Sequence, residues 1–193
     1  MNYLVVDFEF TFYKRPVGRP RAFFPEIIEV GAVKLNETLN ECGKLQSFVK
    51  PHFFPKHAKD AMDFCMITDA DMKKAITFPV MLKKLSAMYE AEQTFFVAWG
   101  DADYKVLNEG CSRHKLENPI IEEDYLDLAE AYKLWKDEEN TPSLKTAIME
   151  MECVADGLAH TAFDDAYNTG KVLAKMLEKG WTYEAYIRAK EAQ

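Results

Sequence analysis

Hydrophobic and polar side chains alternate at the start of the chain, where residues 4–11 read Leu-Val-Val-Asp-Phe-Glu-Phe-Thr. This alternation predicts a strand, because successive side chains on a strand point to opposite faces. Asp7, Glu9 and Thr11 then share one face, and the apolar side chains between them share the other. Two carboxylates so close together in an apolar run repel each other unless a cation lies between them. The pattern predicts either a divalent-metal site, since Mg²⁺ and Mn²⁺ favour carboxylate oxygens, or an edge strand with both acids in water.

The rest of the chain alternates between short apolar runs and amphipathic segments. Further strands are predicted at residues 26–35, 45–49, 94–99 and 120–121, and a hairpin joins the first two of these. A cap at Thr68 to Asp71 begins a short helix. Helical spacing of apolar residues predicts longer helices at residues 78–88, 103–111, 125–136, 143–151, 161–177 and 181–190. Three early strands followed by alternating strands and helices indicate an α/β domain with a mixed sheet.

The composition limits the class of protein. With 193 residues, 48% of them hydrophobic and 29% charged, the chain fits one globular domain with a substantial core. No apolar run approaches the roughly 18 residues that span a bilayer, and Asp7 and Glu9 interrupt the apolar core that a signal peptide needs. The cysteines are widely spaced without a CxxC pair, which predicts reduced, mostly packed thiols in a cytoplasmic protein: Cys42, Cys65, Cys111 and Cys153.

Charge is unevenly distributed along the chain. The formal net charge of −8 argues against a general electrostatic grip on nucleic acid. A nucleic-acid enzyme is still compatible with it, because metal ions neutralise catalytic acids and a local basic patch can guide a polyanion. The loop after the first strand reverses the sign, with Lys14, Arg15, Arg19 and Arg21 within eight residues. This loop either contacts substrate phosphates or is a solvated connection.

Two later segments carry further candidate site residues. Asp101 and Asp103 lie where a predicted strand ends and a helix begins, the kind of junction at which active sites of open α/β sheets gather. Asp101 is placed to cap the helix, the commoner use of such a residue, and Asp103 is placed to point toward the first strand. Both assignments remain open on these residues alone.

The second segment is His160-Thr161-Ala162-Phe163-Asp164-Asp165. Thr161 with Asp164 is similar to a capping box, which gives Asp164 a structural task. Asp165 lies about 100° further around the helix and is free to face elsewhere. His160 precedes the helix, where its imidazole can reach solvent and a bound water. The three other histidines are interpreted as ordinary surface or packing residues.

Taken in order, these residues resemble the DEDDh branch of the DnaQ-like 3′→5′ exonucleases. Asp7 and Glu9 match the first motif of that family, Asp103 the second, and His160 with Asp165 the third. We assign Asp103 rather than Asp101 to the second motif because apolar residues follow it at the family's spacing, at positions 106 and 107. The resemblance covers residues 3–177. The runs Phe-Pro-Glu-Ile-Ile-Glu-Val-Gly at 24–31 and Ile-Thr at 67–68 are similar to the histone-mRNA and small-RNA exonuclease subgroup, which includes the bacterial KapD-like exonucleases.

The resemblance implies a fold and a mechanism. The fold is an RNase H-like three-layer α/β structure whose mixed central sheet, with its first three strands antiparallel, is flanked by helices. Two divalent metal ions, Mg²⁺ or Mn²⁺, are held by Asp7, Glu9, Asp103 and Asp165, and His160 is the general base. This implies one exonuclease domain over residues 1–193, with its core at 3–177 and a C-terminal helix at 181–190.

The resemblance also implies a substrate. Glu9, Phe10 and Thr11 hold the terminal nucleotide, and Lys14 and Arg15 add to substrate binding. The partner is the 3′ end of a single-stranded nucleic acid, RNA favoured over DNA, and the products are nucleoside 5′-monophosphates. Two alternatives belong to other classes: a catalytically silent nucleic-acid-binding or regulatory module on the same fold, and a different metal phosphoesterase. All five catalytic positions are occupied, which favours the active enzyme.

Overall fold

The computed structural model describes residues 1–14, 18–157 and 160–192. The strands within these ranges are β1 (Asn2–Phe10), β2 (Ile27–Leu35), β3 (Glu41–Lys50), β4 (Ile76–Thr77), β5 (Thr94–Ala98) and β6 (Tyr125–Asp127). The α-helices are α1 (Lys59–Phe64), α2 (Asp69–Lys74), α3 (Phe78–Ser86), α4 (Ala102–His114), α5 (Leu128–Lys136), α6 (Leu144–Glu150), α7 (Ala162–Glu178) and α8 (Tyr183–Glu191). Two short 3₁₀ helices are η1 (Pro55–His57) and η2 (Glu122–Asp124). Across these ranges, no helix has both the length and the apolar character needed to cross a membrane.

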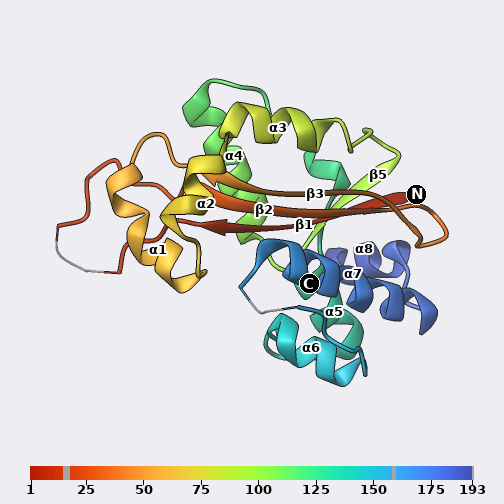
Figure 1. The fold of residues 1–193 in the computed structure, drawn as a ribbon. Helices are drawn as coiled ribbons and strands as arrows, with labels where there is room; N and C mark the ends of the chain where they lie inside the picture. Colours follow the sequence, from red (N-terminus) through yellow and green to blue (C-terminus); the bar gives the residue numbers. More distant parts are fainter. Residues whose placement is uncertain (15–17, 158–159, 193) are drawn as a thin grey trace.

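The strands form one mixed sheet in the order β4-β3-β2-β1-β5-β6. β1, β2 and β3 are antiparallel neighbours, whereas β5 runs parallel to β1 and β6 runs parallel to β5. The predicted α/β class is confirmed, including a mixed sheet with three antiparallel first strands and helices that flank it (Figure 1). β1 lies inside the sheet, so the alternative of an edge strand with both acids in water is wrong.

Helices cover both faces of the sheet, as the alternation along β1 requires. Leu4, Val6 and Phe8 point to one face and pack against α3 and α4. Val5 points to the opposite face, where it shares a core with α5, α6, α7 and α8. Figure 1 shows these two helical layers on opposite sides of the strands. Asp7 and Glu9 continue the Val5 face, so they point toward the layer that contains α7.

A smaller group of helices closes the end of the sheet toward which β1 points. α1 and α2 lie there (Figure 1), and a small core joins Ile28 of β2 to Ala61 and Met62 of α1. The predicted cap of α2 is confirmed. The Thr68 hydroxyl accepts the backbone N–H of Asp71 at 3.2 Å, and the Asp71 carboxylate accepts the backbone N–H of Thr68 at 2.9 Å. The segment that includes η1 and α1 thus brings side chains of residues 56–60 beside residues 12–14, and Cys65 beside Glu9.

The last strand differs from the prediction at residues 120–121. Ile120 is buried in the core beneath α4 and Ile121 leads into η2. The strand is instead β6, which pairs with β5, and α5 begins directly after it. Asp127 ends the strand and caps the helix, its carboxylate accepting the backbone N–H of Glu130 at 2.9 Å. A strand of three residues joined to a helix has too few positions for a period of two to appear in the sequence.

Candidate active site

The polar face of β1 meets the N-terminal end of α7. In the register of the two strands, Asp7 lies opposite Gly31 and Glu9 lies opposite Glu29. Gly31 has no side chain, and the backbone of Ala162 takes that space: a Cβ built on Gly31 would lie 2.1 Å from the carbonyl carbon of Ala162. This one position without a side chain therefore lets the start of α7 lie directly on the sheet.

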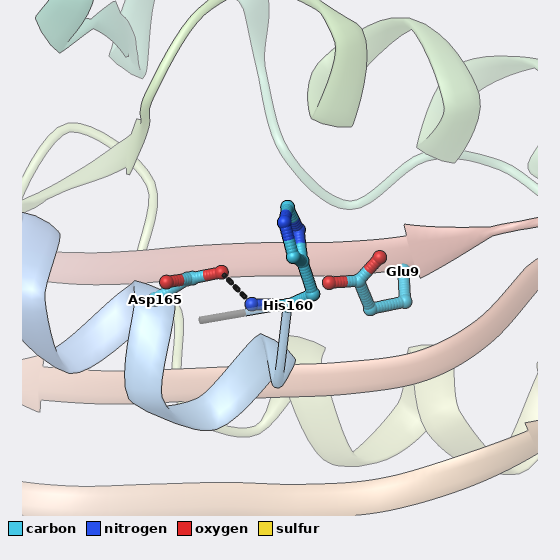
Figure 2. Close-up of side chains that lie close together, drawn as sticks. All are labelled: Glu9, His160 and Asp165. Atoms are coloured by element: carbon cyan, nitrogen blue, oxygen red, sulfur yellow. Dashed lines mark hydrogen bonds between the residues drawn. The ribbon is translucent and has the colours of Figure 1, made fainter. Parts of the chain in front are cut away.

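The start of α7 brings His160 and Asp165 to the same face. His160 has a φ of 66°, which is uncommon for a residue other than glycine. Its backbone N–H donates to the Asp165 carboxylate at 3.0 Å. Glu9, His160 and Asp165 each offer a ligand atom, and these atoms all lie within 4.8 Å of one another. Figure 2 shows the imidazole between the two carboxylates. The structure thus brings the first and last candidate segments together.

Asp103 reaches the group from the first turn of α4. β5 pairs with β1 only as far as Val97 opposite Val5, so the later residues of β1 have no neighbouring β5 residue to bond. The Asp103 carboxylate supplies a partner instead, accepting the backbone N–H of Phe8 at 2.8 Å. Asp103 is only 5% exposed. It is therefore fixed against the backbone of the strand that carries Asp7.

Two expected helix caps differ from the prediction. Asp101 occupies the N-cap position of α4 but makes no capping hydrogen bond within the described residues, and it pairs with Lys105 on the exposed surface. Thr161 occupies the N-cap position of α7, and its side chain likewise makes no capping hydrogen bond in the described part of the chain. The Thr161 half of the predicted capping box with Asp164 is therefore absent. In each helix the candidate site acid, Asp103 or Asp165, is a different residue from the expected cap.

The acids strongly perturb one another. Burial raises the pKa of Asp7 well above its ordinary value, and the negative charges of Asp103, Glu9 and Asp165 raise it further. Burial also raises the pKa of Asp103 to about 7 and the pKa of Glu29 to about 7. A bound cation relieves repulsion of this kind. Carboxylate oxygens with one imidazole suit a hard divalent cation, so the residues present fit such an ion.

The raised pKa values predict how the metal-free protein responds to pH. The folded-state pKa of Asp7, Asp103 and Glu29 lies above the unfolded value near 4, so each group contributes stability that is complete below about pH 4 and lost as pH rises toward about 7. In EDTA, the melting temperature is expected to fall between about pH 5 and about pH 8, and Mn²⁺ should reduce the fall. Calorimetry at several pH values tests this. An Asp7→Asn variant is the control, and an equally steep fall in that variant would show that Asp7 does not contribute to it.

Two residues of this group were not singled out from the sequence. Glu29 is 2% exposed, and its carboxylate accepts the backbone N–H of Ala162 at 3.4 Å, which ties β2 to the start of α7. The thiol of Cys65 donates to the Glu9 carboxylate at 3.1 Å. A single carboxylate within an apolar strand was a usable signal for Glu29. Cys65 gave no comparable signal, because nothing in its local pattern relates it to β1.

The residues expected to hold the substrate lie at and beyond the end of β1. Phe10 is half-buried. Thr11 is fully buried, its hydroxyl accepting the backbone N–H of Glu26 at 2.9 Å and its own N–H donating to the Glu26 carbonyl at 2.8 Å. The Thr11 side chain thereby fixes the end of β1 against the segment before β2. Lys14 is exposed, and Arg15 lies outside the described residues.

The fold and the grouped acids define a class of enzyme. Residues 4–173 match the Exonuclease family RNase_T, and the chain belongs to this family. It is a 3′-5′ exonuclease, a hydrolase of nucleic acids. Enzymes of the DEDDh family use divalent metals.

Two curated relatives cover nearly the whole chain. The "Probable 3'-5' exonuclease KapD" of Bacillus subtilis (strain 168) is 33% identical over 183 residues, which cover 93% of this chain and 86% of KapD. The "3'-5' exoribonuclease 1" of Homo sapiens is 26% identical over 187 residues, which cover 91% of this chain and 52% of the human protein. The chain thus spans about half the length of the human exoribonuclease.

A solved structure gives the same result for the fold. The nuclease domain of 3'hExo, described as a DEDDh family member bound to rAMP, has 26% sequence identity and a TM-score of 0.77, with 93% of this chain and 92% of that chain covered. Cell-death related nuclease 4 (CRN-4), at 19% identity, has a TM-score of 0.77 over 93% of this chain and 64% of that chain, a likeness of fold alone. The resemblance to DEDDh exonucleases and the RNase H-like fold are confirmed.

Proposed function

We propose that this exonuclease removes nucleoside 5′-monophosphates from the 3′ end of single-stranded RNA, with two Mg²⁺ or Mn²⁺ ions. Residues 1–193 would form a single exonuclease domain, with its core at residues 3–177. One observation carries the proposal. Four acids and a histidine from three distant parts of the chain converge on one face and one end of β1: Asp7, Glu9, Asp103, His160 and Asp165.

The four acids are proposed to hold the metal ions. Bound ions would supply positive charge that stabilises the attacking and leaving oxygens of a phosphodiester. The chain's contribution is to hold the acids in place before substrate arrives. The backbone N–H of Phe8 fixes Asp103, and the backbone N–H of His160 fixes Asp165. The Cys65 thiol donates to Glu9. Such fixed partners lower the cost of ordering the group when substrate binds.

His160 is proposed to be the general base. Its side chain is exposed, and it lies beside Glu9 and Asp165, so it can reach a water in the same space. Imidazole is the side chain that most often accepts a proton at neutral pH. His160 would take the proton from the attacking water, and the proton would then leave to solvent from the exposed ring.

The substrate end is proposed to lie along Glu9, Phe10 and Thr11, mainly against the backbone, since the Thr11 side chain is buried. Lys14 and Arg15 would meet the phosphates that follow. The other two cations of this loop, Arg19 and Arg21, are not both free to bind phosphate. The Arg19 guanidinium lies 5.3 Å from the centroid of the Phe23 ring, so Arg19 already has a packing partner.

RNA is the proposed substrate, with DNA as the alternative. The human relative is named an exoribonuclease, and the similar 3'hExo structure holds rAMP. A more distant neighbour, Escherichia coli Exonuclease I, holds a dT13 oligonucleotide, and at 18% identity it supports the fold alone. The human relative and the 3'hExo structure, both at 26% identity, therefore support RNA, whereas the name of KapD does not specify a nucleic acid.

The central test is digestion of matched RNA and DNA oligonucleotides that carry a label at the 3′ or the 5′ end. With Mg²⁺ or Mn²⁺, the 3′ label should appear first as a labelled mononucleotide, and the 5′ label should move down a ladder of shortened products. EDTA should stop the reaction. Digestion that begins at the 5′ end, or full activity in excess EDTA, would contradict the proposal. Binding without cleavage under every metal condition would favour the silent nucleic-acid-binding module.

Asp103 and Asp101 form a matched pair for testing the second acid. Asp103→Asn is expected to lower kcat by on the order of 10²-fold or more and to weaken Mn²⁺ binding, because a buried ligand loses its charge. Asp101→Asn should leave both nearly unchanged, since that acid is exposed and pairs with Lys105. Steady-state kinetics and Mn²⁺ calorimetry measure the two effects. The opposite ranking would move the second motif to Asp101.

A further inference from the structure

The surface beyond the end of β1 is mainly positively charged, whereas the active site is negatively charged. A cavity of about 270 Å³ lies there, and its lining includes Tyr13, Lys14, Lys56, His57, Lys59 and Asp60. We call it the basic cavity. Among the described residues, three lysines and a histidine line it with a single acid, in a protein of net charge −8. We propose that the basic cavity binds backbone phosphates of the substrate strand upstream of the nucleotide being removed, an inference that rests on the proposed exonuclease function.

A wall of packed aromatic rings holds the two segments that form the basic cavity. The ring of His57, in η1, lies 5.6 Å from the ring of Tyr13, which follows β1. Tyr13 in turn lies 5.6 Å from Phe23, and Phe23 lies 5.3 Å from Phe54. These contacts join the segment after β1 to the segment before α1. Lys56 therefore extends from a packed support, which lowers the entropy lost when it binds a ligand.

The lysines of the basic cavity are available to a ligand. Lys14, Lys56 and Lys59 are exposed. Lys59 pairs with Asp63 at 2.5 Å, with both side chains largely in solvent. An exposed pair of this kind contributes little, so a phosphate can compete for Lys59. Exposed cations along an open surface suit a strand that passes through, whereas a captured small anion is usually enclosed by buried donors.

Two ring contacts connect the basic cavity with the active site. The imidazole of His160 lies 4.7 Å from the ring of Phe64, measured between centroids, and Phe64 lies 6.0 Å from Phe12. Phe12 also lines the basic cavity. A single strand carries one phosphate per about 3.4 Å when stacked, so the cavity lies roughly two to four phosphates from the bond being cleaved. Cations beside aromatic rings are the combination with which proteins bind single strands.

The test uses a double variant, Lys56→Gln with Lys59→Gln, in the full chain. The matched control is Lys83→Gln with Lys84→Gln, two exposed lysines on α3, outside the lining of the basic cavity. The first measurement is the affinity for a labelled ten-nucleotide RNA in EDTA at several salt concentrations, by fluorescence anisotropy. Each phosphate contact on a single strand contributes about 0.7 to the slope of log affinity against log salt, so the double variant should lose about 1.4. The control should keep the slope of the parent.

The second measurement compares kcat/KM on the ten-nucleotide RNA and on a dinucleotide too short to reach the basic cavity, with Mn²⁺ present. The double variant should lose roughly tenfold on the longer substrate, through KM, and keep the parent value on the dinucleotide. An unchanged salt slope together with an unchanged KM would overturn the inference. So would loss of affinity for inorganic phosphate with unchanged affinity for RNA, because the cavity would then be a small-anion site. If the parent cleaves neither substrate, the proposed function fails, and the anisotropy measurement still decides the role of the cavity.

Discussion

Asp7→Asn is expected to lower turnover by on the order of 10³-fold or more while leaving the fold intact. Asp7 lies on the inner strand β1, where burial raises its pKa, and the negative charges of Asp103, Glu9, Asp165 and Glu29 raise it further. It is therefore the acid at the centre of the group. Replacing it with a neutral amide removes the ligand on which the proposed metal site depends.

The same substitution should have the opposite effect on stability. In metal-free buffer, Asp7→Asn removes part of the repulsion within the group, so the melting temperature should rise. Mn²⁺ should raise the melting temperature of the parent and have little effect on the variant. Glu117→Gln is the control, since Glu117 is an exposed acid in the loop after α4. Near-normal turnover in the Asp7 variant would remove the metal hypothesis.

His160→Ala is expected to lower kcat by on the order of 10²–10⁴-fold, the usual contribution of a general base. Affinity for Mn²⁺ should be largely retained, because the four acids are unchanged. A loss confined to kcat, with little change in KM, would agree with a proton-transfer role. Kinetics and Mn²⁺ calorimetry on the same preparations separate the two effects.

The backbone at His160 requires a second variant. Its φ of 66° is more costly for alanine than for asparagine, so a changed turn is a second route by which His160→Ala can lose activity. His160→Asn keeps a residue that adopts this conformation and removes the proton acceptor. Equal losses in the two variants support the general base. Recovery of activity in His160→Asn would show that the turn, and with it the hydrogen bond to Asp165, is what matters.

The sequence pattern singled out acids that the structure brings together, but it did not predict how they meet. Alternation along the first strand placed Asp7 and Glu9 on one face, and the order of the motifs added Asp103, His160 and Asp165. Nothing in that pattern shows that the start of α7 lies directly on the sheet. That contact depends on the missing side chain of a single glycine, and its partner lies more than a hundred residues away. Such a contact is a property of the packed fold and leaves no local periodicity.

The misses in the fold have similar causes. β6 has three residues and continues into α5, so its residues were included in the helical pattern. Glu29 was included in an apolar strand because most of that strand is indeed buried, and its relation to Glu9 follows only from the register of β1 and β2. The place of Glu29 beside the site therefore follows from the pairing of the strands, which the sequence alone does not give.

Two of the hydrogen bonds that fix the site join parts of the chain that are synthesised at different times. Phe8 and Asp103 are 95 residues apart, and Ala162 and Glu29 are 133 residues apart. Synthesis proceeds from the N-terminus, so β1 with Asp7 is made long before α7 with Asp165. A growing chain that has not yet reached α7 lacks its base and one of its four acids. We therefore expect the growing chain to stay inactive until α7 has been made and has docked on the sheet.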